Sequence, residues 1–514
     1  MDKAIAVIDI GMTNKKVAVY DLSLRVLDTV SRSFDPVMVE GLETHDLRGM
    51  EGWFLDRLAE FGKRFPIGAI AVTTHGATMV CVGEDGGPCA PCVYYTHEPG
   101  PEFQARFYGA MGDARELQAV TGTPRLSAMI NPSKGLFFLR ERFPEAFAKS
   151  HVVLNYPQYW GYRLTGKTGA EGTYTGCHSY LWNWGEGRYS SVAEKLGIAK
   201  KLPFPLRDSW DVLGTLTVEV AGRTGLGPDT IVTMGIHDSN ASLLPHLAKR
   251  SGGDFILNST GTWCVLMHPQ ERFAFEPGEL GKVVFFNRSA YNKPVKTAIF
   301  LGGMEYEAWT GAIRTACGIA SGGTDVLPEP AAADYRAVVD SRSTFILPEL
   351  VPGSGQFPGQ AARLVQGGSS RALSDIRLGA GAPALVKDPK VALAALNLSL
   401  AMQTLVALER AGLGPATSVF TEGGFRRNSG YNAILAAALG EGRSGGAYLT
   451  DIAEATAFGA AMTAAAALGG TNPDALGGLF EIDYKRVLPM EGAGDLGAYR
   501  RAWLGAMGVN GGKA

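Results

Sequence analysis

Two glycine-centred turns constrain the fold of this chain more than any other sequence feature. The first spans residues 9–14 and the second 258–263, and their glycines, Gly11 and Gly261, stand 250 positions apart. Apolar runs on both sides of each turn predict strands, and glycine tolerates backbone angles that other residues resist. Such turns aim consecutive N–H groups at an anion. The pair therefore predicts a phosphate clamp built twice, although an ordinary β-hairpin with a polar turn would explain either turn alone.

The length and composition of the chain predict a two-domain globular protein. Its 514 residues exceed what one hydrophobic core usually supports, and 46% hydrophobic with 19% charged residues is ordinary for a globular fold. The 48 Lys and Arg balance 50 Asp and Glu, so no basic excess would attract nucleic acid or an anionic membrane. A small molecule is therefore the expected partner.

The sequence favours a cytoplasmic protein with reduced thiols. The N-terminal apolar run is broken by Asp9 too early for a signal-peptide core. Residues 455–470 are mostly alanine and fall short of about 20 strongly apolar residues, so they predict a buried helix. Six cysteines are sparse for this length. Cys89 and Cys92 form a C-x-x-C pair, but Pro91 and the β-like residues that follow argue against a redox site.

Strand-like and helix-like segments alternate along the chain, which predicts an α/β fold. Residues 67–82 predict a strand, a polar loop and a second strand, and 231–234 predict a strand that ends at Gly-Ile-His-Asp. Residues 391–411 and 431–439 carry alanine and leucine at helical spacing. Residues 320–390 are rich in glycine, proline and serine, and we expect loops there rather than a third domain.

The domain boundary is expected at 247–253, where charge and glycine interrupt the apolar periodicity. We therefore predict an N-terminal domain over 1–248, a C-terminal domain over 249–470, and an extension over 471–514 that packs on the core. Each of the two domains would then hold one glycine turn.

The ordered motifs of the chain resemble the FGGY carbohydrate kinase family. Residues 9–16 are similar to its first phosphate motif, D-x-G-T-T-x-x-[RK], with Lys16 at the cationic position. Asp9 ends a predicted strand, where a carboxylate can hold a divalent metal ion. Met12 replaces the usual threonine and removes one hydroxyl donor. The resemblance implies the α/β fold of actin, hexokinase and the Hsp70 chaperones, which is a two-domain actin-like ATPase (ribonuclease H-like) fold with an interdomain cleft.

Residues 161–168 match the P-loop spacing G-x-x-x-x-G-K-T letter for letter, but the context differs. A P-loop needs a strand before the first glycine and a helix that begins at the lysine, so that amides at the helix N-terminus meet phosphate. Here the preceding residues predict a helix, and the following ones have no helical pattern. We reject a P-loop; within the resemblance, 162–166 look like the family's Y-R-L-T-G scaffold, which leads to Glu171 and Thr173.

Residues 235–239 resemble the family's G-x-x-D motif, which implies that Asp238 is the catalytic base. Phosphoryl transfer needs little covalent help, so a carboxylate that accepts the proton of a sugar hydroxyl supplies the main side-chain chemistry. Asp238 could instead cap the helix that begins at Ser239, since aspartate is a favoured N-cap. The order of the surrounding motifs favours the base.

Three further segments resemble the nucleotide side of the family. Residues 259–263 are similar to its second phosphate motif, and 422–428 to its adenosine motif G-G-G-[SA]-x-N. Phe425 replaces a glycine there and Arg426 a small residue, so we expect a partly closed adenine pocket or a stacked arrangement. Residues 451–461 look like the family's E-A-T-A-L-G-A-A helix, whose small residues allow close packing.

The sugar side of the resemblance indicates a ketose. The H-D-[ST] form at 237–239 and the G-T-W form at 261–263 resemble rhamnulokinases and fuculokinases more than glycerol kinases. The loop at 74–78 departs from their T-[WF]-G-V-D, because Thr78 replaces a carboxylate and His75 an aromatic ring, and such a loss can shift substrate preference. A xylulose-type pattern, Q-x-H-G, shares the histidine and glycine but needs a glutamine before them. His75 is left open as a sugar ligand or a hydrogen-bonded core histidine.

These motifs predict an ATP-dependent phosphotransferase that uses Mg²⁺ and phosphorylates a hydroxyl of a ketose of the rhamnulose, fuculose or pentulose type in carbohydrate catabolism. An actin- or Hsp70-like ATPase without sugar transfer and an inactive sugar-binding regulator are the alternatives. We expect a sugar as partner, no nucleic acid and no membrane, and we leave a homodimer open. The predicted site residues are, for catalysis, Asp238; for the metal ion, Asp9; for the nucleotide, Gly11, Thr13, Asn14, Lys16, Thr260, Gly261, Thr262, Gly423, Gly424, Phe425 and Asn428; and for the sugar, Thr74, His75, Gly76, Thr78 and His237.

Overall fold

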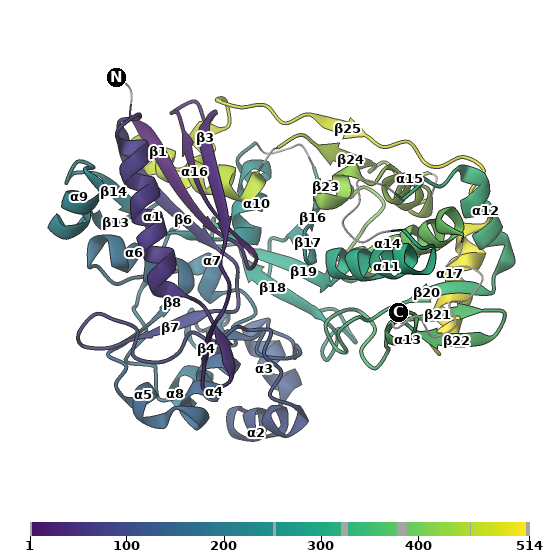
Figure 1. Cartoon of the computed structure of the whole chain (residues 1–514), viewed down its shortest axis with the longest axis horizontal. Helices are drawn as coiled ribbons and strands as arrows, with labels where there is room; N and C mark the ends of the chain where they lie inside the picture. The colour runs from purple at the N-terminus through teal and green to yellow at the C-terminus, as the bar shows by residue number, and fades with distance from the viewer. Residues whose placement is uncertain are drawn as a thin grey trace. The chain divides into compact units, whose positions relative to one another are not determined.

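The computed structural model describes residues 3–249, 253–319, 327–377, 388–440, 442–452 and 454–509. The chain divides into two compact units, the first made of Met1–Gly252, Pro269–Lys296 and Ile452–Ile482, and the second of Gly253–His268, Thr297–Asp451 and Asp483–Ala514. The units are interleaved in sequence, whereas the predicted division into 1–248, 249–470 and 471–514 is continuous. The difference arises mainly because helix α16 (Ala455–Leu468) packs on strands of the first unit (Figure 1). Residues 250–252 of the predicted boundary lie outside the described residues.

The first unit is built on a mixed sheet with the strand order β13-β14-β6-β1-β2-β3, and β15 also pairs with β6. Strands β1, β2 and β3 are antiparallel, whereas β6 runs parallel to β1, β14 and β15. The strands are β1 (Ala4–Ile10), β2 (Asn14–Tyr20), β3 (Val26–Ser33), β6 (Ile67–Thr74), β13 (Val212–Thr215), β14 (Ile231–Thr233) and β15 (Ile236–His237). The predicted strands around the first glycine turn are thus confirmed.

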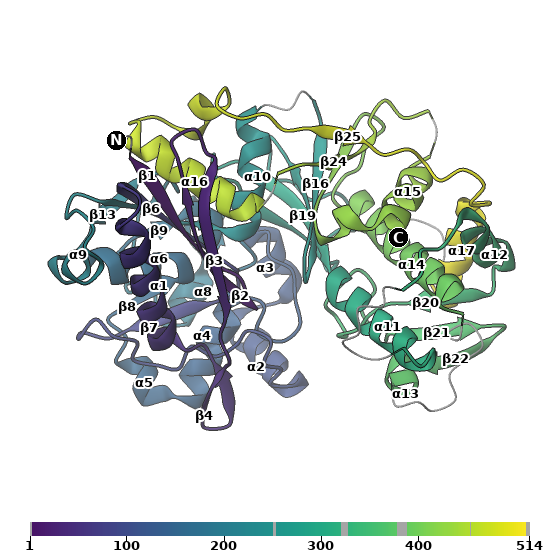
Figure 2. The same cartoon turned by 45° about the horizontal axis from the view of Figure 1, so that its top comes forward.

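Helices cover both faces of this sheet, because alternate residues of a strand point to opposite sides. Ala6 and Ile8 of β1 join a core with α1 (Leu47–Gly62) and α6 (Tyr156–Thr165). Ile5 and Val7 join a second core with α10 (Asp238–Lys249) and α16. Figure 2 shows α1 and α16 beside the N-terminal strands.

Helices α10 and α16 approach each other closely at Gly459. A Cβ atom at this position would lie 1.8 Å from the carbonyl oxygen of Ala241, so only glycine fits. The small residues of this segment therefore serve close packing, and the buried helix predicted over 455–470 is confirmed.

The P-loop-like residues 161–168 lie at the end of α6 and not after a strand. Gly161 is inside the helix, and Gly166 ends it with a φ of 68° in the left-handed region that favours glycine. The rejection of a P-loop is confirmed.

The rest of the first unit surrounds this sheet with short elements. They are β4 (Val37–Val39), β5 (Leu42–Thr44), β7 (Met79–Val82), α2 (Pro101–Met111), α3 (Ala114–Thr121), α4 (Pro132–Arg142), α5 (Pro144–Ala148), β8 (Val152–Asn155), β9 (Ala170–Glu171), α7 (Gly172–Thr175), β10 (Trp182–Asn183), β11 (Arg188–Tyr189), α8 (Ser191–Lys195), β12 (Leu206–Arg207), α9 (Val218–Thr224), β18 (Val284–Arg288) and the 3-10 helix η3 (Pro473–Leu476). Among them, β7 pairs with β8.

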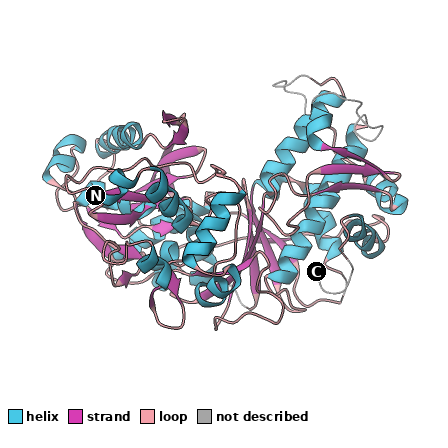
Figure 3. Cartoon of the chain, turned by 90° about the horizontal axis from the view of Figure 1, so that it is seen from below, coloured by secondary structure: helices cyan, strands magenta, loops and turns pink. Residues whose placement is uncertain are grey.

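The second unit has its own sheet, with the order β19-β17-β16-β23-β24-β25. Strand β16 is antiparallel to β17 and parallel to β23, which repeats the hairpin of the first unit around the second glycine turn. Its elements are β16 (Phe255–Thr260), β17 (Cys264–Pro269), β19 (Pro294–Phe300), α11 (Gly302–Ala316), α14 (Pro389–Arg410), β23 (Ser418–Gly423), η2 (Gly424–Arg427), α15 (Ser429–Ala438), β24 (Ala447–Thr450), β25 (Tyr484–Arg486) and α17 (Leu496–Ala506). In Figure 3, helices in cyan flank the strands of each unit in magenta.

Helix α14 forms the centre of the second core. Among the described residues it is the one helix long and apolar enough to cross a membrane, but 94% of its apolar window is buried inside the protein. The core helix of a globular unit passes the same test of length and composition. Its burial explains the nearly continuous run of apolar residues between Ala392 and Leu408.

The expectation of loops throughout 320–390 is wrong for the described part of that segment. It contains α12 (Ala332–Ser341), α13 (Leu373–Arg377) and a three-stranded sheet of β20 (Thr344–Leu347), β21 (Arg363–Gln366) and β22 (Ser369–Ala372). Buried Tyr335, Val338 and Val339 give α12 its apolar face. The glycine and proline residues between these short elements dominate the local composition, so the short apolar patterns were not recognised in the sequence. Residues 320–326 and 378–387 lie outside the described residues.

Candidate active site

Three parallel strands of the first unit end at one edge of the sheet. Ile10, at the end of β1, pairs in register with Thr74 of β6, and His237 at the end of β15 pairs with the same residue. Because adjacent parallel strands bring their carboxyl ends together, the phosphate turn, the loop at 74–78 and Asp238 lie at this edge. The structure thus gathers residues that are far apart in sequence.

The first glycine turn joins β1 to β2 and places Asp9 opposite Lys16. The N–H of Gly11 donates to the carbonyl of Asn14 at 3.0 Å, which closes the turn. Asp9 and Lys16 are direct cross-strand partners, so their side chains share one face. The Lys16 Nζ lies 3.9 Å from Oδ2 of Asp9.

Two other predicted phosphate ligands lie at the surface of this turn. Thr13 is exposed, and Asn14 is exposed with its Oδ1 accepting a hydrogen bond from the Ser33 hydroxyl at 2.8 Å. Lys15 points the other way: its buried ammonium donates to the carbonyl of Met12 at 2.7 Å. Burial lowers the pKa of Lys15 to about 8. Lys15 therefore stabilises the turn through its backbone and is buried on the side away from Lys16.

Glu454 is a residue of this site that the sequence analysis missed. It stands at the start of α16 in a left-handed conformation, with a φ of 56°, and its carboxylate forms an ion pair and hydrogen bond with Lys16. The motif over 451–461 indicated only a helix of small residues, and 438 positions separate Glu454 from Lys16. No local pattern links the two.

The carboxylate of Asp9 sits in an environment that disfavours its charge. Burial raises its pKa to about 7; Lys16 opposes this shift, while Asp238 and Glu454 add to it. Carboxylates gathered in this way offer the oxygen ligands that Mg²⁺ prefers. The donor set around Asp9 therefore fits the metal ion that the motif implies.

Asp238 is the first residue of α10, directly after β15. Its Oδ1 accepts from the backbone N–H of Ser239 at 2.6 Å and from the Ser239 hydroxyl at 3.3 Å. A capping aspartate would instead accept from the second or third N–H of the helix. Burial raises the pKa of Asp238 to about 6, and the two bonds from Ser239 oppose the shift.

A hydrogen-bonded chain from α7 positions the backbone before Asp238. Glu171 caps α7 by accepting from the N–H of Thr173 at 2.8 Å and from its hydroxyl at 2.7 Å. The Thr173 hydroxyl oxygen in turn accepts from the N–H of His237 at 3.0 Å. Burial raises the pKa of Glu171 to about 7, although these bonds oppose it. The scaffold element at 162–166 thus leads to residues that hold the candidate base in place.

The predicted sugar loop is buried and folds against aromatic rings. The ring of His75 stacks on His45, with centroids 5.3 Å apart, and Tyr156 lies at 5.2 Å. The Thr74 hydroxyl donates to the His75 carbonyl at 3.0 Å, and the backbone of Thr78 is held by the Tyr174 hydroxyl. The Thr74 hydroxyl therefore stabilises the backbone of the loop and is already engaged in a hydrogen bond.

Several polar atoms of this region are buried without a partner among the described residues. They are Nε2 of His75, Oγ1 of Thr78 and Nδ1 of His237. The Nδ1 of His75 contacts the Gly76 carbonyl at 2.8 Å, and a carbonyl can only accept, so Nε2 must carry a lone pair. Burial lowers the pKa of His75 to about 3, which keeps the ring neutral. Unpaired buried groups are costly and indicate a polar ligand.

The second glycine turn is held by Thr260. Its hydroxyl donates to the carbonyl of Glu422 and accepts from the N–H of Phe425 at 3.0 Å. Gly423 has a φ of 77°, and a Cβ there would lie 1.9 Å from the Thr260 carbonyl oxygen, so glycine is required. Gly261 and Thr262 are exposed. Of the two threonines, only Thr262 is available to a phosphate.

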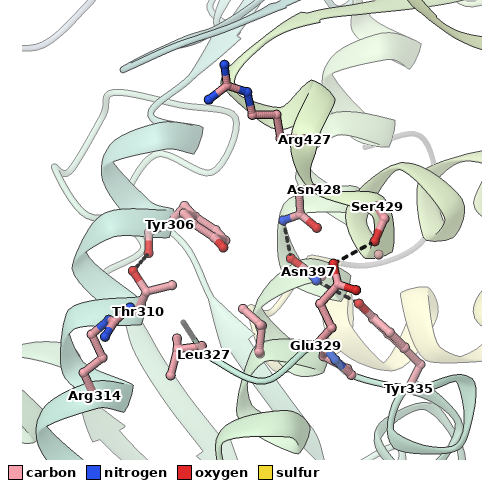
Figure 4. Close-up of a pocket in the computed structure, with 13 residues that line it drawn as sticks. Tyr306, Thr310, Arg314, Leu327, Glu329, Tyr335, Asn397, Arg427, Asn428 and Ser429 are labelled. Carbon is pink, nitrogen blue, oxygen red and sulfur yellow. Dashed lines mark hydrogen bonds between the residues drawn. The ribbon is translucent and has the colours of Figure 1, made fainter. Parts of the chain in front are cut away.

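A cavity of about 260 Å³ opens in the second unit beside the adenosine motif (Figure 4). The side chain of Asn428 donates to Asn397 at 2.8 Å, and Asn397 donates to the Tyr335 hydroxyl at 2.8 Å. The Ser429 hydroxyl donates to Glu329 at 3.2 Å. The lining residues are Tyr306, Thr310, Arg314, Leu327, Glu329, Pro330, Tyr335, Leu393, Asn397, Arg427, Asn428, Ser429 and Gly430.

The two bulky residues of the adenosine motif do not fill this cavity. The Phe425 ring is buried against Tyr431 and Tyr306, with centroids 4.9 Å and 5.8 Å apart. The Arg426 guanidinium donates to the carbonyl of Thr450 at 2.8 Å. Of the predicted nucleotide residues in the second unit, Asn428 lines the cavity, whereas Phe425 is part of the hydrophobic core.

Each of the two α/β units has a glycine turn between antiparallel strands, and the chain has the two-domain actin-like, ribonuclease H-like fold. Family models match almost the whole chain. The model described as "FGGY family of carbohydrate kinases, N-terminal domain" matches residues 4–245, and "Carbohydrate kinase FGGY, C-terminal domain" matches 252–472. The chain belongs to the FGGY family of carbohydrate kinases.

Solved structures of kinases share this fold over their full length. A carbohydrate kinase from Novosphingobium aromaticivorans is 27% identical, with 99% of each chain covered and a TM-score of 0.77. A xylulose kinase from Lactobacillus acidophilus is 16% identical, with 99% of this chain and 98% of that chain covered and a TM-score of 0.79. A glycerol kinase from Plasmodium falciparum, solved with ADP, is 14% identical, with 100% and 99% covered and a TM-score of 0.75. No curated protein matches the sequence significantly.

The protein is therefore a carbohydrate kinase, a phosphotransferase that uses ATP and an alcohol group as acceptor. Its partner is a small-molecule sugar. The family favours this class over the motor-like ATPase that the two turns alone would allow.

Proposed function

We propose that this kinase transfers the γ-phosphate of ATP to a hydroxyl of a ketose, with Asp238 as the catalytic base. The observation that carries the proposal is a raised-pKa carboxylate at the same sheet edge as a loop with unpaired buried polar atoms. An acid with a pKa near 6 is ionised at neutral pH and still basic enough to take a hydroxyl proton.

The sugar is proposed to bind in the first unit, against the loop at 74–78. The lone pair on Nε2 of His75 would accept a bond from one sugar hydroxyl, and Oγ1 of Thr78 would pair with another. Both contacts are neutral. A site of neutral donors and acceptors suits an uncharged ketose of the rhamnulose, fuculose or pentulose type better than a sugar acid.

The phosphate side is proposed to use Asp9, Lys16 and the first turn. Lys16 would stabilise negative charge on the transferred phosphoryl group, together with the amides around Gly11. Asp9 would hold Mg²⁺, which when bound neutralises phosphate charge and orients the phosphate chain. Lys16 must exchange Glu454 for phosphate, and that exchange is easy because the Glu454 side chain is 54% exposed.

The nucleotide base is proposed to occupy the cavity in the second unit. Asn428, Asn397 and the hydroxyls of Tyr306 and Tyr335 offer the hydrogen bonds that a purine edge and ribose need. Thr262 and the amides of the second turn would then meet the phosphates.

The test is a coupled assay of ADP release with Mg-ATP against ketoses, aldoses, polyols and sugar acids. Asp238→Asn is the test variant. Asp56→Asn is the matched control, because Asp56 lies on α1 in the same unit and pairs with Arg223 at the surface. We expect ADP release that depends on one ketose, a loss of roughly 100-fold or more in Asp238→Asn, and no change in Asp56→Asn.

Other outcomes would contradict parts of the proposal. Dependence on a polyol or a sugar acid would overturn the ketose assignment but keep the kinase. A fall of less than about 10-fold in Asp238→Asn would overturn its role as base. A protein that binds ATP and ketose without turnover would be the inactive regulator.

A further inference from the structure

A cysteine and two histidines converge beside the candidate base. The thiol of Cys177 and ring nitrogens of His178 and His237 all lie within 4.8 Å of one another. Cys177 and His178 follow α7, and His237 ends β15, so the cluster joins two elements of the first unit. Cys177 and His237 are buried, at 2% and 4% exposure. The kinase chemistry proposed above uses neither the thiol nor His178.

The distance between the thiol of Cys177 and the ring of His237 matches a tetrahedral zinc site. Thiolate sulfur and imidazole nitrogen are preferred zinc ligands, with bonds of about 2.3 Å and 2.0–2.1 Å. At a tetrahedral angle these bond lengths place sulfur and nitrogen about 3.6 Å apart. The Sγ of Cys177 lies 3.6 Å from Nε2 of His237. These two ligands would need almost no movement to share an ion.

Gly76 packs closely against the two histidine rings of the cluster. A Cβ atom at this residue would lie 2.6 Å from Nε2 of His237 and 2.9 Å from Nε2 of His178. Both nitrogens therefore face the same side of the sugar loop, and any larger residue at position 76 would obstruct them. His178 adopts a left-handed backbone with a φ of 38°, which is uncommon for a residue other than glycine and marks a constrained position.

The protonation states suit metal binding. Burial lowers the pKa of His178 and of His237 to about 3, so both rings are neutral and offer lone pairs at physiological pH. Burial raises the pKa of the Cys177 thiol, so the ion would displace its proton.

We propose that Cys177, His178 and His237 form a reversible binding site for Zn²⁺ and that zinc bound there inhibits the kinase. The Oδ1 of Asp238 lies 3.5 Å from Nε2 of His237, so an ion held by His237 is within reach of the base. Zinc would then neutralise the carboxylate that must accept the sugar proton. The proposed inhibition rests on the proposed function of Asp238 as the base. The proposed zinc-binding site is independent of that function.

The site should be moderate in affinity rather than permanently filled. Histidines that hold a resident zinc donate their other N–H to an acceptor, and losing such a partner costs about 10–100-fold in affinity. Nδ1 of His237 is buried without a partner among the described residues. Reversible binding is what an inhibitory site requires.

Binding is tested first without nucleotide, because ATP itself chelates zinc. Chelator-treated protein is dialysed against Zn²⁺ and its metal content measured, and Co²⁺ is added separately to record the absorption of a cobalt–thiolate bond. Wild type should bind one ion per chain and show the band; Cys177→Ser and His178→Gln should bind at least ~10-fold more weakly, and Cys177→Ser should lose the band. Cys89→Ser is the matched control, since this thiol in the same unit lies outside the cluster.

Thermal unfolding separates a lost site from a misfolded variant. Zn²⁺ should raise the Tm of wild type and Cys89→Ser, because a ligand of the native state stabilises it, and should leave the Tm of both cluster variants unchanged. Cluster variants that melt like wild type without metal have kept the fold. Absence of stoichiometric binding, or binding that survives both cluster substitutions, would overturn the site.

Inhibition is measured as the ratio of rates with and without free Zn²⁺ at saturating Mg-ATP. Wild type should lose at least ~10-fold in rate and recover with chelator, and Cys177→Ser should show a smaller ratio. If one Zn²⁺ binds per chain but the rate does not fall, the inhibitory role is overturned, while the zinc-binding site still stands. If no sugar supports turnover, the metal and Tm measurements still decide the site, so failure of the proposed function is distinguishable.

Discussion

The carboxylate of Asp238 accepts two hydrogen bonds from its neighbour Ser239, one from the backbone N–H at 2.6 Å and one from the hydroxyl at 3.3 Å. Both bonds favour the ionised form and hold its pKa near 6 against the effect of burial. Ser239 therefore lowers the pKa of the candidate base relative to the value that burial alone would give.

Ser239→Ala should move the acidic limb of the rate profile to higher pH. The base must be ionised to accept a proton, so the rate should rise as the pH passes the pKa of Asp238. Loss of the hydroxyl bond raises that pKa further, because the backbone bond alone remains. The measurement is kcat/KM for the sugar from pH 5 to 9. An unchanged limb would assign it to another group, such as Asp9.

Asp238→Asn should stabilise the protein more at pH 8 than at pH 5. A carboxyl whose pKa is raised by burial favours the folded state when protonated and opposes it when ionised, so its stabilising contribution is lost as the pH rises through about 6. Asparagine is neutral at both values. The check is Tm for wild type and variant at the two pH values. An equal difference at both would show that the carboxylate is not destabilised by its surroundings.

Thr260→Val and Thr262→Val should separate stability from nucleotide binding. The buried Thr260 hydroxyl satisfies the N–H of Phe425, and leaving that group unpaired costs about 1–3 kcal/mol of unfolding free energy. Thr262 is exposed, so its replacement should change stability by less than about 0.5 kcal/mol. Urea unfolding and KM for ATP are measured for both. Thr262→Val should raise KM, and a normal KM in that variant would remove Thr262 from the phosphate site.

Glu454→Gln should lower the KM for ATP. The carboxylate competes with phosphate for Lys16, and a pair this exposed contributes at most about 1 kcal/mol, so the change should not exceed roughly five-fold. Salt should reduce the difference, because it screens exposed charges. Glu481→Gln, which removes a surface partner of Lys249 in the same unit, is the control. A higher KM in Glu454→Gln would mean that Glu454 positions Lys16 rather than blocking it.

The same removal of charge should also lower the pKa of Asp9, since Glu454 contributes to its rise to about 7. Titration of Asp9 by NMR in the two proteins would measure this. An unchanged pKa of Asp9 would contradict the electrostatic coupling of Asp9 to Glu454.

The first hairpin and its glycine turn were predicted from the sequence alone, and the structure adds the pairing of Asp9 with Lys16. A strand, a short glycine turn and a second strand impose an antiparallel register, and that register sets which side chains face each other. The helical spacing of α14 and the small residues of α16 are likewise local patterns that predict burial. The order of the motifs along the chain was sufficient to identify the family.

Only the tertiary structure decided which distant residues meet. Glu454 reaches Lys16 because α16 packs on β1 and β6, and Cys177 reaches His237 because Thr173 ties α7 to the end of β15. Phe425 departs from the motif but lies in a core formed with Tyr431 and Tyr306. Local sequence determines propensity and register, which depend on near neighbours, whereas these contacts depend on how separate elements bury their apolar faces against one another.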